Sequence, residues 1–338
     1  MYKSAILGCR GRGRRHADAY KTVEKGKLVA ACDMDESLLD PFAADYEVPQ
    51  KYTDAHEMLD REKPDLLHIV TKPNLRVPLL TIAHEHKVPG VIVEKPLALD
   101  NEDFSAISAL GKVTSTKICV NHQLRYHPKL LELLDDVRDG KIGDVQFIDA
   151  SSRLNLAGQG THILNLVLAF NGGERPDLVF GNVSGKGELE SHHPAPEMAV
   201  AQINFPNRVR CLMANGNNAV AADDEEAKSM HKRIAVYGTH GFVHWKMNAW
   251  ERSTTETDIE KGEKSYGEED DLGQAAMTDA MFDWLEDDGR PHANRLETSL
   301  AETNTVLGLY SSAIHGKPVE LPYSSDEHLL EGLRTKPK

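Results

Sequence analysis

Short apolar segments alternate with amphipathic segments over the first 120 residues of the chain. The apolar segments predict strands at residues 4–7, 28–32, 66–70, 90–93 and 117–120. The amphipathic segments predict helices at residues 13–25, 36–46, 55–61, 77–86 and 102–111. Nearly continuous apolar strands separated by helices are typical of a parallel sheet that is covered on both faces. Residues 1–120 are therefore expected to form a doubly wound α/β domain.

The hydrophobic pattern changes after residue 121. Helices are expected at residues 128–138, 161–170, 274–286 and 296–315. Alternating apolar and polar positions predict strands at residues 144–151, 178–184, 197–205, 208–214, 233–237 and 241–246. Such alternation with tight turns favours a large, mostly antiparallel open sheet. Residues 121–338 are thus predicted to form an α+β domain for substrate binding and oligomerisation, with its helix at 296–315 packing back toward the first domain.

Two polar segments of this second part predict surface loops, at residues 219–229 and 251–271. Trp245 and Trp250 precede the second loop and are expected to pack under a hairpin. The alternative is that they form a platform for a sugar. His192 and His193 are adjacent, and neighbouring residues of a strand point to opposite faces. We therefore predict no metal site.

Composition limits the classes of partner. The 338 residues carry a formal net charge of −14, which disfavours nucleic acid and anionic membranes as partners. No apolar run approaches the length of about 18 residues that a membrane-spanning helix needs. The four cysteines lie mostly in apolar runs without metal-ligand spacing, which favours buried free thiols. We expect a cytoplasmic protein.

The first predicted strand runs into a turn rich in glycine and arginine, and a helix follows. Gly8 and Gly13 fit the outer positions of the pattern Gly-x-Gly-x-x-Gly, but Arg10 occupies the middle position and Gly11 is displaced by one. A glycine turn before a helix presents backbone amides and the positive helix end to a pyrophosphate. Either Gly11 provides the room for the phosphates or Arg10 folds away and adds a cation, together with Arg12.

An acidic residue ends the second predicted strand. Asp33 lies where a carboxylate would accept hydrogen bonds from the adenosine ribose hydroxyls. It would repel a 2′-phosphate, so the prediction is NAD, with NADP as the alternative because of the nearby arginines. A helix-capping role is the simpler alternative for Asp33.

Two further strand ends carry polar motifs, Thr71-Lys72-Pro73-Asn74 and Glu94-Lys95-Pro96-Leu97-Ala98. Ligands of doubly wound sheets collect at the carboxyl ends of strands. Together with the glycine turn and Asp33, these motifs resemble the Gfo/Idh/MocA family, named after glucose–fructose oxidoreductase and inositol dehydrogenase. The resemblance covers nearly the whole chain and implies an N-terminal Rossmann domain. It also implies cofactor contacts from Thr71, Pro73, Asn74, Glu94, Lys95 and Asn121.

The resemblance implies that Lys95 is catalytic and lies between the nicotinamide and the substrate. A cation there would stabilise a developing alkoxide, and partial burial would let it pass a proton. It also implies His162 as a second catalytic residue, with Arg125, Gln159 and Asn165 on the substrate.

The chain departs from the family at one acid. The family pattern of Asp, three residues, His, two residues, Asp places Gly158 at the first acid and Asn165 at the last. A glycine cannot charge or orient a histidine, so Lys95 and His162 would carry the proton transfer without it. The simpler alternatives are a salt bridge at the domain interface for Arg125 and a residue at a helix start without a catalytic role for His162.

We hypothesise that the protein transfers a hydride between NAD(P) and a secondary alcohol of a sugar, cyclitol or sugar derivative bound between the two domains. The missing acid at Gly158 favours, as an alternative, a lyase or hydrolase that keeps its NAD. A further alternative is a dinucleotide-binding sensor or assembly subunit without catalysis. By resemblance, we expect a homodimer or homotetramer formed through the second sheet.

Overall fold

The computed structural model describes residues 1–335, which fold into two compact units. The first contains Met1–Ala98, Ser105–Tyr126 and Asp270–Ser299, and the second contains Leu99–Phe104, His127–Glu269 and the chain from Leu300 on. The predicted boundary at residue 120 differs, because the chain returns to the first unit at Asp270. The last three residues of the predicted second domain, 336–338, lie outside the described part of the chain.

The first unit contains a parallel sheet, as predicted, but with six strands instead of five. Its strands are β1 (Tyr2–Leu7), β2 (Gly26–Cys32), β3 (Gln50–Tyr52), β4 (Leu66–Ile69), β5 (Gly90–Val93) and β6 (Lys117–Val120). They lie in the order β3-β2-β1-β4-β5-β6, which is a doubly wound arrangement. The sequence prediction missed β3, because two of its three side chains are exposed and it has no apolar run.

Ten helices occur in residues 1–335. They are α1 (Gly11–Asp18), α2 (Glu36–Asp45), α3 (Ala55–Glu62), α4 (Arg76–Glu85), α5 (Asn101–Val113), α6 (Pro128–Arg138), α7 (Thr161–Phe170), α8 (Tyr266–Glu286), α9 (Leu296–His315) and α10 (Leu329–Thr335). None of these helices combines the length and the apolar character needed to cross a membrane.

Helix α8 packs on the sheet of the first unit. A Cβ at Gly26 would lie 2.4 Å from the Phe282 ring, and one at Gly90 would lie 2.9 Å from the Met281 methyl group. The missing side chains of these two strand-start glycines therefore make room for α8. The first turn of α9, up to Ser299, also belongs to this unit, and the predicted packing of the helix at 296–315 stays a prediction.

The second unit contains a nine-stranded, mostly antiparallel sheet, as predicted. Its strands are β7 (Val145–Ser152), β8 (Leu178–Ser184), β9 (Met198–Asn204), β10 (Arg210–Gly216), β11 (Lys232–Gly238), β12 (Phe242–Lys246), β13 (Ala249–Ser253), β14 (Glu260–Glu263) and β15 (Val319–Glu320). Their order is β14-β13-β12-β11-β7-β10-β9-β8-β15, and the pair β7–β10 is parallel.

The predicted loop at 251–271 is wrong. Strands β13 and β14 pair antiparallel in this segment, and α8 already begins at Tyr266. The hydrophobic pattern of the sequence did not predict these two strands, because their side chains are mostly polar and are partly exposed on both faces. Trp245 of β12 is buried and pairs across strands with the partly buried Trp250 of β13, and the prediction that both pack under a hairpin stays a prediction.

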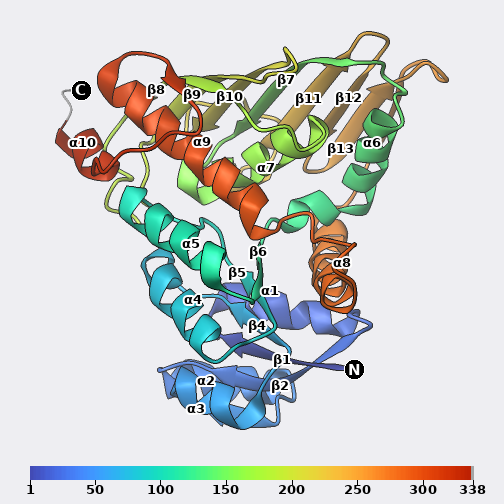
Figure 1. Cartoon of the computed structure of the whole chain (residues 1–338). Coiled ribbons are helices and arrows are strands. Elements are labelled where there is room, and N and C mark those ends of the chain that lie inside the picture. Colours follow the sequence, from blue (N-terminus) through green and yellow to red (C-terminus); the bar gives the residue numbers. More distant parts are fainter. Residues whose placement is uncertain (336–338) are drawn as a thin grey trace. The chain divides into compact units, whose positions relative to one another are not determined.

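Helices α6, α7 and α9 lie along one face of the nine-stranded sheet (Figure 1). Leu309 of α9 contacts Gly181 of β8 so closely that a Cβ there would lie 2.7 Å from it. Large apolar side chains are exposed on the strands of this sheet, namely Phe180, Val200, Leu212 and Tyr237.

Candidate active site

The turn between β1 and α1 requires glycine at two positions. Gly8 has φ +105°, and a Cβ on it would lie 2.2 Å from the carbonyl oxygen of Val70. A Cβ on Gly13 would lie 2.0 Å from the carbonyl oxygen of Gly8. The first glycine therefore permits the turn and the last permits close packing of helix on strand, which are their roles in a dinucleotide turn.

Arg10 and Gly11 share the middle of the turn. Helix α1 begins at Gly11, and Arg10 precedes it with extended backbone angles, φ −76° and ψ −178°. A Cβ on Gly11 would meet no atom within 4 Å. The amides of Gly11, Arg12 and Gly13 belong to the first helical turn, where no helix carbonyl is available to them.

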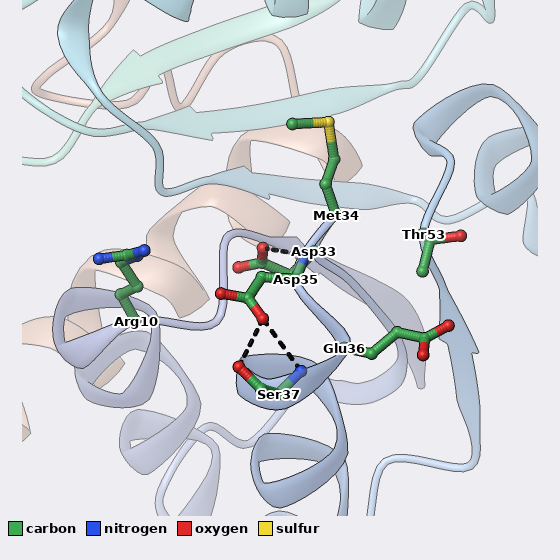
Figure 2. A pocket seen from close by; sticks show the side chains of 7 residues that line it. All are labelled: Arg10, Asp33, Met34, Asp35, Glu36, Ser37 and Thr53. Carbon is green, nitrogen blue, oxygen red and sulfur yellow. Dashed lines mark hydrogen bonds between the residues drawn. The ribbon is translucent and has the colours of Figure 1, made fainter.

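Asp33 is fixed beside this turn. Its carboxylate accepts a hydrogen bond from the Cys9 amide at 2.8 Å and one from the Asp35 amide at 3.1 Å. A hollow of about 720 Å³ lies in front of it, lined by Arg10, Asp33, Met34, Asp35, Glu36, Ser37 and Thr53. Figure 2 shows Arg10 on one side of the hollow and Glu36 with Thr53 on the other. The hollow is rich in carboxylates, which favours ribose hydroxyls over a phosphate.

The end of β4 is held by a buried arginine that sequence analysis missed. Arg76 is 1% exposed, and its guanidinium donates to the Thr71 carbonyl at 2.9 Å and to the Lys95 carbonyl at 3.4 Å. Burial lowers the pKa of Arg76 to about 10. Pro73 is buried and Asn74 exposed in the short helical turn that follows. Arg76 thus ties together the loops after β4 and β5.

Glu94, at the end of β5, is the centre of a buried cluster. One of its oxygens accepts from Arg12 Nε at 3.0 Å, from His16 Nε2 at 3.0 Å and from Asn121 Nδ2 at 2.6 Å. Burial alone would raise the pKa of the Glu94 carboxyl, but Arg12 and the His16 hydrogen bond outweigh it and hold this pKa well below its usual value. Glu94 is therefore an anion at neutral pH.

Asn121 and Arg125 have structural partners in the first unit. Asn121 is fully buried, and its side-chain oxygen accepts from Gln274 Nε2 of α8 at 3.0 Å. Arg125 donates to the carbonyl of Ala293 at 3.2 Å. Asn121 therefore has a structural role as a hydrogen-bond donor to Glu94. The predicted contacts of Asn121 and Arg125 with the cofactor or the substrate stay predictions.

Lys95 is partly buried at the end of β5, and its peptide bond to Pro96 is cis. Burial lowers the pKa of Lys95 to about 8, while the Glu94 carboxylate opposes this shift. A lysine with such a pKa can both hold and release a proton near neutral pH. Lys95 therefore has the properties of a proton-transfer group.

The predicted substrate residues of the second unit lie around the start of α7. His162 is 4% exposed and Asn165, one turn further on, is fully buried. Asn165 donates to the Glu302 carboxylate of α9 at 2.6 Å. Glu302 is 2% exposed and had no signal in the sequence. His162 and Asn165 share a helix face, and a buried acid lies beside the second of them.

Gly158 lies in a single π-helical turn, Leu156–Gly160, that leads into α7. Its amide donates to the side-chain oxygen of Asn155 at 2.7 Å. A Cβ on Gly158 would lie 2.9 Å from that oxygen. An acid at position 158 would therefore have to displace the Asn155 carboxamide, so the departure from the family pattern is built into the local structure. Gln159 is partly buried in the same turn.

Sequence analysis missed the histidines of the Glu94 cluster. His16 and His68 are fully buried, and both lie within predicted elements where a polar residue interrupts an apolar face. The only available signal was that interruption. Within residues 1–335, no three His, Cys, Asp or Glu side chains are placed to share a metal ion.

The glycine turn, the fixed Asp33 and the strand-end loops fit a dinucleotide, because the tight glycines leave the room that its phosphates need. They define a dinucleotide-binding domain of the Rossmann type. Residues 2–122 match the model of the Gfo/Idh/MocA family, described as an oxidoreductase family with an NAD-binding Rossmann fold. The N-terminal 2–122 part of the chain is therefore similar to this family.

Curated relatives are dehydrogenases. D-apiose dehydrogenase of Paraburkholderia graminis is 29% identical over 142 residues, which are 42% of this chain and 38% of that protein. Inositol 2-dehydrogenase of Rhizobium meliloti is 27% identical over 251 residues, which are 70% of this chain and 73% of that protein. The match to the first relative thus spans well under half of that protein's length.

Solved structures share the fold of nearly the whole chain. Levoglucosan dehydrogenase in complex with NADH and levoglucosan has a TM-score of 0.82 at 14% identity, covering 95% of this chain and all of that one. An oxidoreductase from Agrobacterium radiobacter in complex with NAD+, L-tartaric acid and magnesium has a TM-score of 0.81 at 17% identity, covering 94% and 98%. Both fold units therefore occur together in known oxidoreductases.

Proposed function

We propose that the protein is an NAD-dependent dehydrogenase that acts on a secondary alcohol of a sugar, cyclitol or sugar derivative. The observation that carries this proposal is Lys95, whose pKa burial lowers to about 8, at the end of a strand of the NAD-binding sheet. The names of the relatives, which include apiose, inositol and levoglucosan dehydrogenases, support the substrate class.

The residues of the first unit have separate tasks in this proposal. Asp33 would accept hydrogen bonds from ribose hydroxyls, and the amides that follow Arg10 would bind the pyrophosphate. When bound, NAD supplies the hydride acceptor. Lys95 in its neutral form would accept the proton of the substrate hydroxyl during oxidation, and in its charged form would return it during reduction. Arg76 would keep the Lys95 backbone in place through its hydrogen bond to the carbonyl.

We propose that His162 and Asn165 bind substrate hydroxyl groups. The support is chemical: both are polar, buried and on one face of α7, in positions where the family pattern has its histidine and last acid. Glu302 would orient Asn165 through their 2.6 Å hydrogen bond. Exchange of His162 for Ala is expected to lower kcat/KM without weakening NAD binding.

The test is a substrate screen with the full chain. Myo-inositol, D-apiose, levoglucosan and related polyols would each be mixed with NAD and, separately, with NADP, and the near-ultraviolet absorbance of the reduced cofactor would be followed. We expect reduction of NAD with at least one of these compounds and a lower kcat/KM with NADP. Cofactor binding without any reduction across a broad panel would contradict the dehydrogenase and favour a sensor or assembly subunit.

One observation favours a second candidate, a lyase or hydrolase that retains its NAD. Gly158 and its Asn155 contact exclude the acid that family members place before the histidine. Without that acid, the proton transfer around His162 differs from the family pattern, and oxidation could be one step of a larger reaction. The discriminating result is tightly bound cofactor in the purified protein, with new products but no net change in cofactor absorbance.

We further propose that the protein is a cytoplasmic homo-oligomer. The apolar side chains Phe180, Val200, Leu212 and Tyr237 are 37–49% exposed on the strands of the nine-stranded sheet. Burial of this apolar surface against a second copy would be favourable. Light scattering is expected to show a dimer or tetramer, and Leu212→Glu is expected to weaken the association. A monomer at micromolar concentration would contradict this proposal.

A further inference from the structure

A chain of buried polar side chains runs through the first unit from Tyr20 to the Glu94 carboxylate. The Tyr20 hydroxyl lies 2.8 Å from Nε2 of His68, Nδ1 of His68 lies 3.0 Å from Nδ1 of His16, and Nε2 of His16 lies 3.0 Å from Glu94. Both histidines are fully buried, between α1 and β4. Buried polar groups in an apolar interior require partners, and here each histidine has one at both ring nitrogens.

With both histidine rings neutral, only one placement of the protons gives each of these three hydrogen bonds a donor and an acceptor. The Glu94 carboxylate can only accept, so Nε2 of His16 donates to it. Burial lowers the pKa of His16 and of His68, so both rings are neutral and carry one proton each. Nδ1 of His16 must then accept from Nδ1 of His68, and Nε2 of His68 accepts from the Tyr20 hydroxyl. All three hydrogen bonds point the same way, toward Glu94.

We propose that Tyr20, His68 and His16 are positioning residues whose hydrogen-bond chain fixes the Glu94 carboxylate next to Lys95 and thereby controls how tightly Lys95 holds its proton. Hydrogen bonds aligned in one direction polarise one another, so the distant members strengthen the donor that reaches Glu94. The inference rests on the proposed function only where it assigns the proton transfer to Lys95.

The other charged groups around Lys95 act in the opposite direction. Arg12 from α1 and Arg76 from α4 lower the pKa of Lys95, whereas Glu94 raises it. His16 is neutral, and Asp270 of α8 acts on His16 by favouring its charged form. The Arg12 side chain is 34% exposed, so solvent weakens its attraction to Glu94. His16, in contrast, is fully buried, so water does not weaken its hydrogen bond to Glu94.

Three variants separate the members of the chain. His68→Leu keeps the volume but removes the donor to His16, so Glu94 loses the support of the chain. His68→Asn keeps an amide donor toward His16 and loses only the hydrogen bond with the Tyr20 hydroxyl. Tyr20→Phe also removes only this hydrogen bond. The expected order of effect is His68→Leu first, with His68→Asn and Tyr20→Phe both smaller and similar.

The readout is the titration of Lys95, followed by NMR of the full chain with ¹³C-labelled lysine and assigned by the spectrum of Lys95→Ala. We expect His68→Leu to lower the apparent pKa of Lys95 by about a few tenths of a pH unit, less than loss of the Glu94 charge itself would, and the other two variants to lower it by less than half of that. The pH profile of kcat/KM should shift by the same amount. ¹⁵N-histidine NMR of the unmodified protein should show His16 protonated at Nε2 and His68 at Nδ1.

A folded His68→Leu variant with an unmoved Lys95 titration would overturn the proposal, and so would the reverse tautomers in the unmodified protein. If His68→Leu does not fold, the tautomers and the titrations of His68→Asn and Tyr20→Phe decide instead. Neither NMR readout requires turnover. A failure to find a substrate would therefore count against the dehydrogenase and leave the test of this chain intact.

Discussion

Two regions at the carboxyl edge of the six-stranded sheet are built in opposite ways. The turn from Gly8 to Gly13 is made from backbone, with the exposed Arg10 in it and the partly buried Asp33 beside it. The cluster around Glu94 is made from side chains that come from α1, β4, β5 and the segment after β6, and its core is dry. The glycine turn leaves room for a ligand, whereas the Glu94 cluster stabilises a buried carboxylate.

This difference has consequences for mutations. Backbone geometry depends on a few glycines, so a change there should alter folding and dinucleotide affinity. A buried charge cluster depends on matched donors and acceptors, so a change there should alter proton transfer and its pH dependence.

The largest effect is expected from Lys95→Ala. Loss of a group that transfers the substrate proton should lower kcat/KM by about 10²–10⁴-fold, because general acid–base catalysis contributes about that much. Affinity for NAD, measured by calorimetry, should change by no more than a few-fold. Lys112→Ala, at an exposed position of α5, is the matched control. Unchanged turnover in Lys95→Ala would contradict the mechanism.

Gly8→Ala and Gly11→Ala form a pair within the turn. A side chain at Gly8 would clash with the Val70 carbonyl at a positive φ, so we expect a loss of about 2–4 kcal/mol in the free energy of unfolding. At Gly11 there is open space, so stability should change by less than about 1 kcal/mol. NAD affinity should nevertheless fall in Gly11→Ala if this glycine leaves room for phosphates. Equal denaturation midpoints in the two variants would contradict the geometry.

The pH dependence of oxidation should follow Lys95. The base must be neutral, so kcat/KM should rise with pH and level off above about 8. Glu94 favours the charged lysine. Glu94→Gln should therefore lower the pKa of Lys95 and move the rising limb to lower pH, by about one unit. A limb that moves to higher pH would show that Glu94 does not act on Lys95 as a charge.

The smallest effect is expected from Arg10→Gly. Arg10 is exposed at the hollow that Asp33 lines, so a contact with a phosphate would be screened by solvent. We expect NAD affinity to fall by about 3–10-fold, and less at high salt. Tighter binding in this variant would show that Arg10 is only tolerated in the middle of the turn.

The fold was largely predictable from the sequence. Buried parallel strands have continuous apolar runs, so β1, β2, β4, β5 and β6 were found where the structure has them. Strands β13 and β14 were missed because pairing between backbones, rather than an apolar face, defines them. The path of α8 was missed as well, since the small residues that receive it, Gly26 and Gly90, are distant in sequence.

The candidate site was predictable only in part. Gly8, Asp33 and Lys95 lie at strand ends, and Gly13 lies in the first turn of the helix after β1, so local sequence was enough to nominate them. Arg76, His16, His68 and Glu302 act through contacts between distant segments, which no local pattern records. The Gly158 departure was visible in the sequence, but its cause, the Asn155 contact, required coordinates.

The most direct test of the account is a crystal structure of the full chain with NAD and a polyol that it oxidises. We predict that both adenosine ribose hydroxyls lie within hydrogen-bond reach of Asp33, and that the reacting hydroxyl lies within about 3.2 Å of Lys95 Nζ. A dinucleotide bound away from Gly8 and Asp33, or a reacting hydroxyl out of reach of Lys95, would contradict the account.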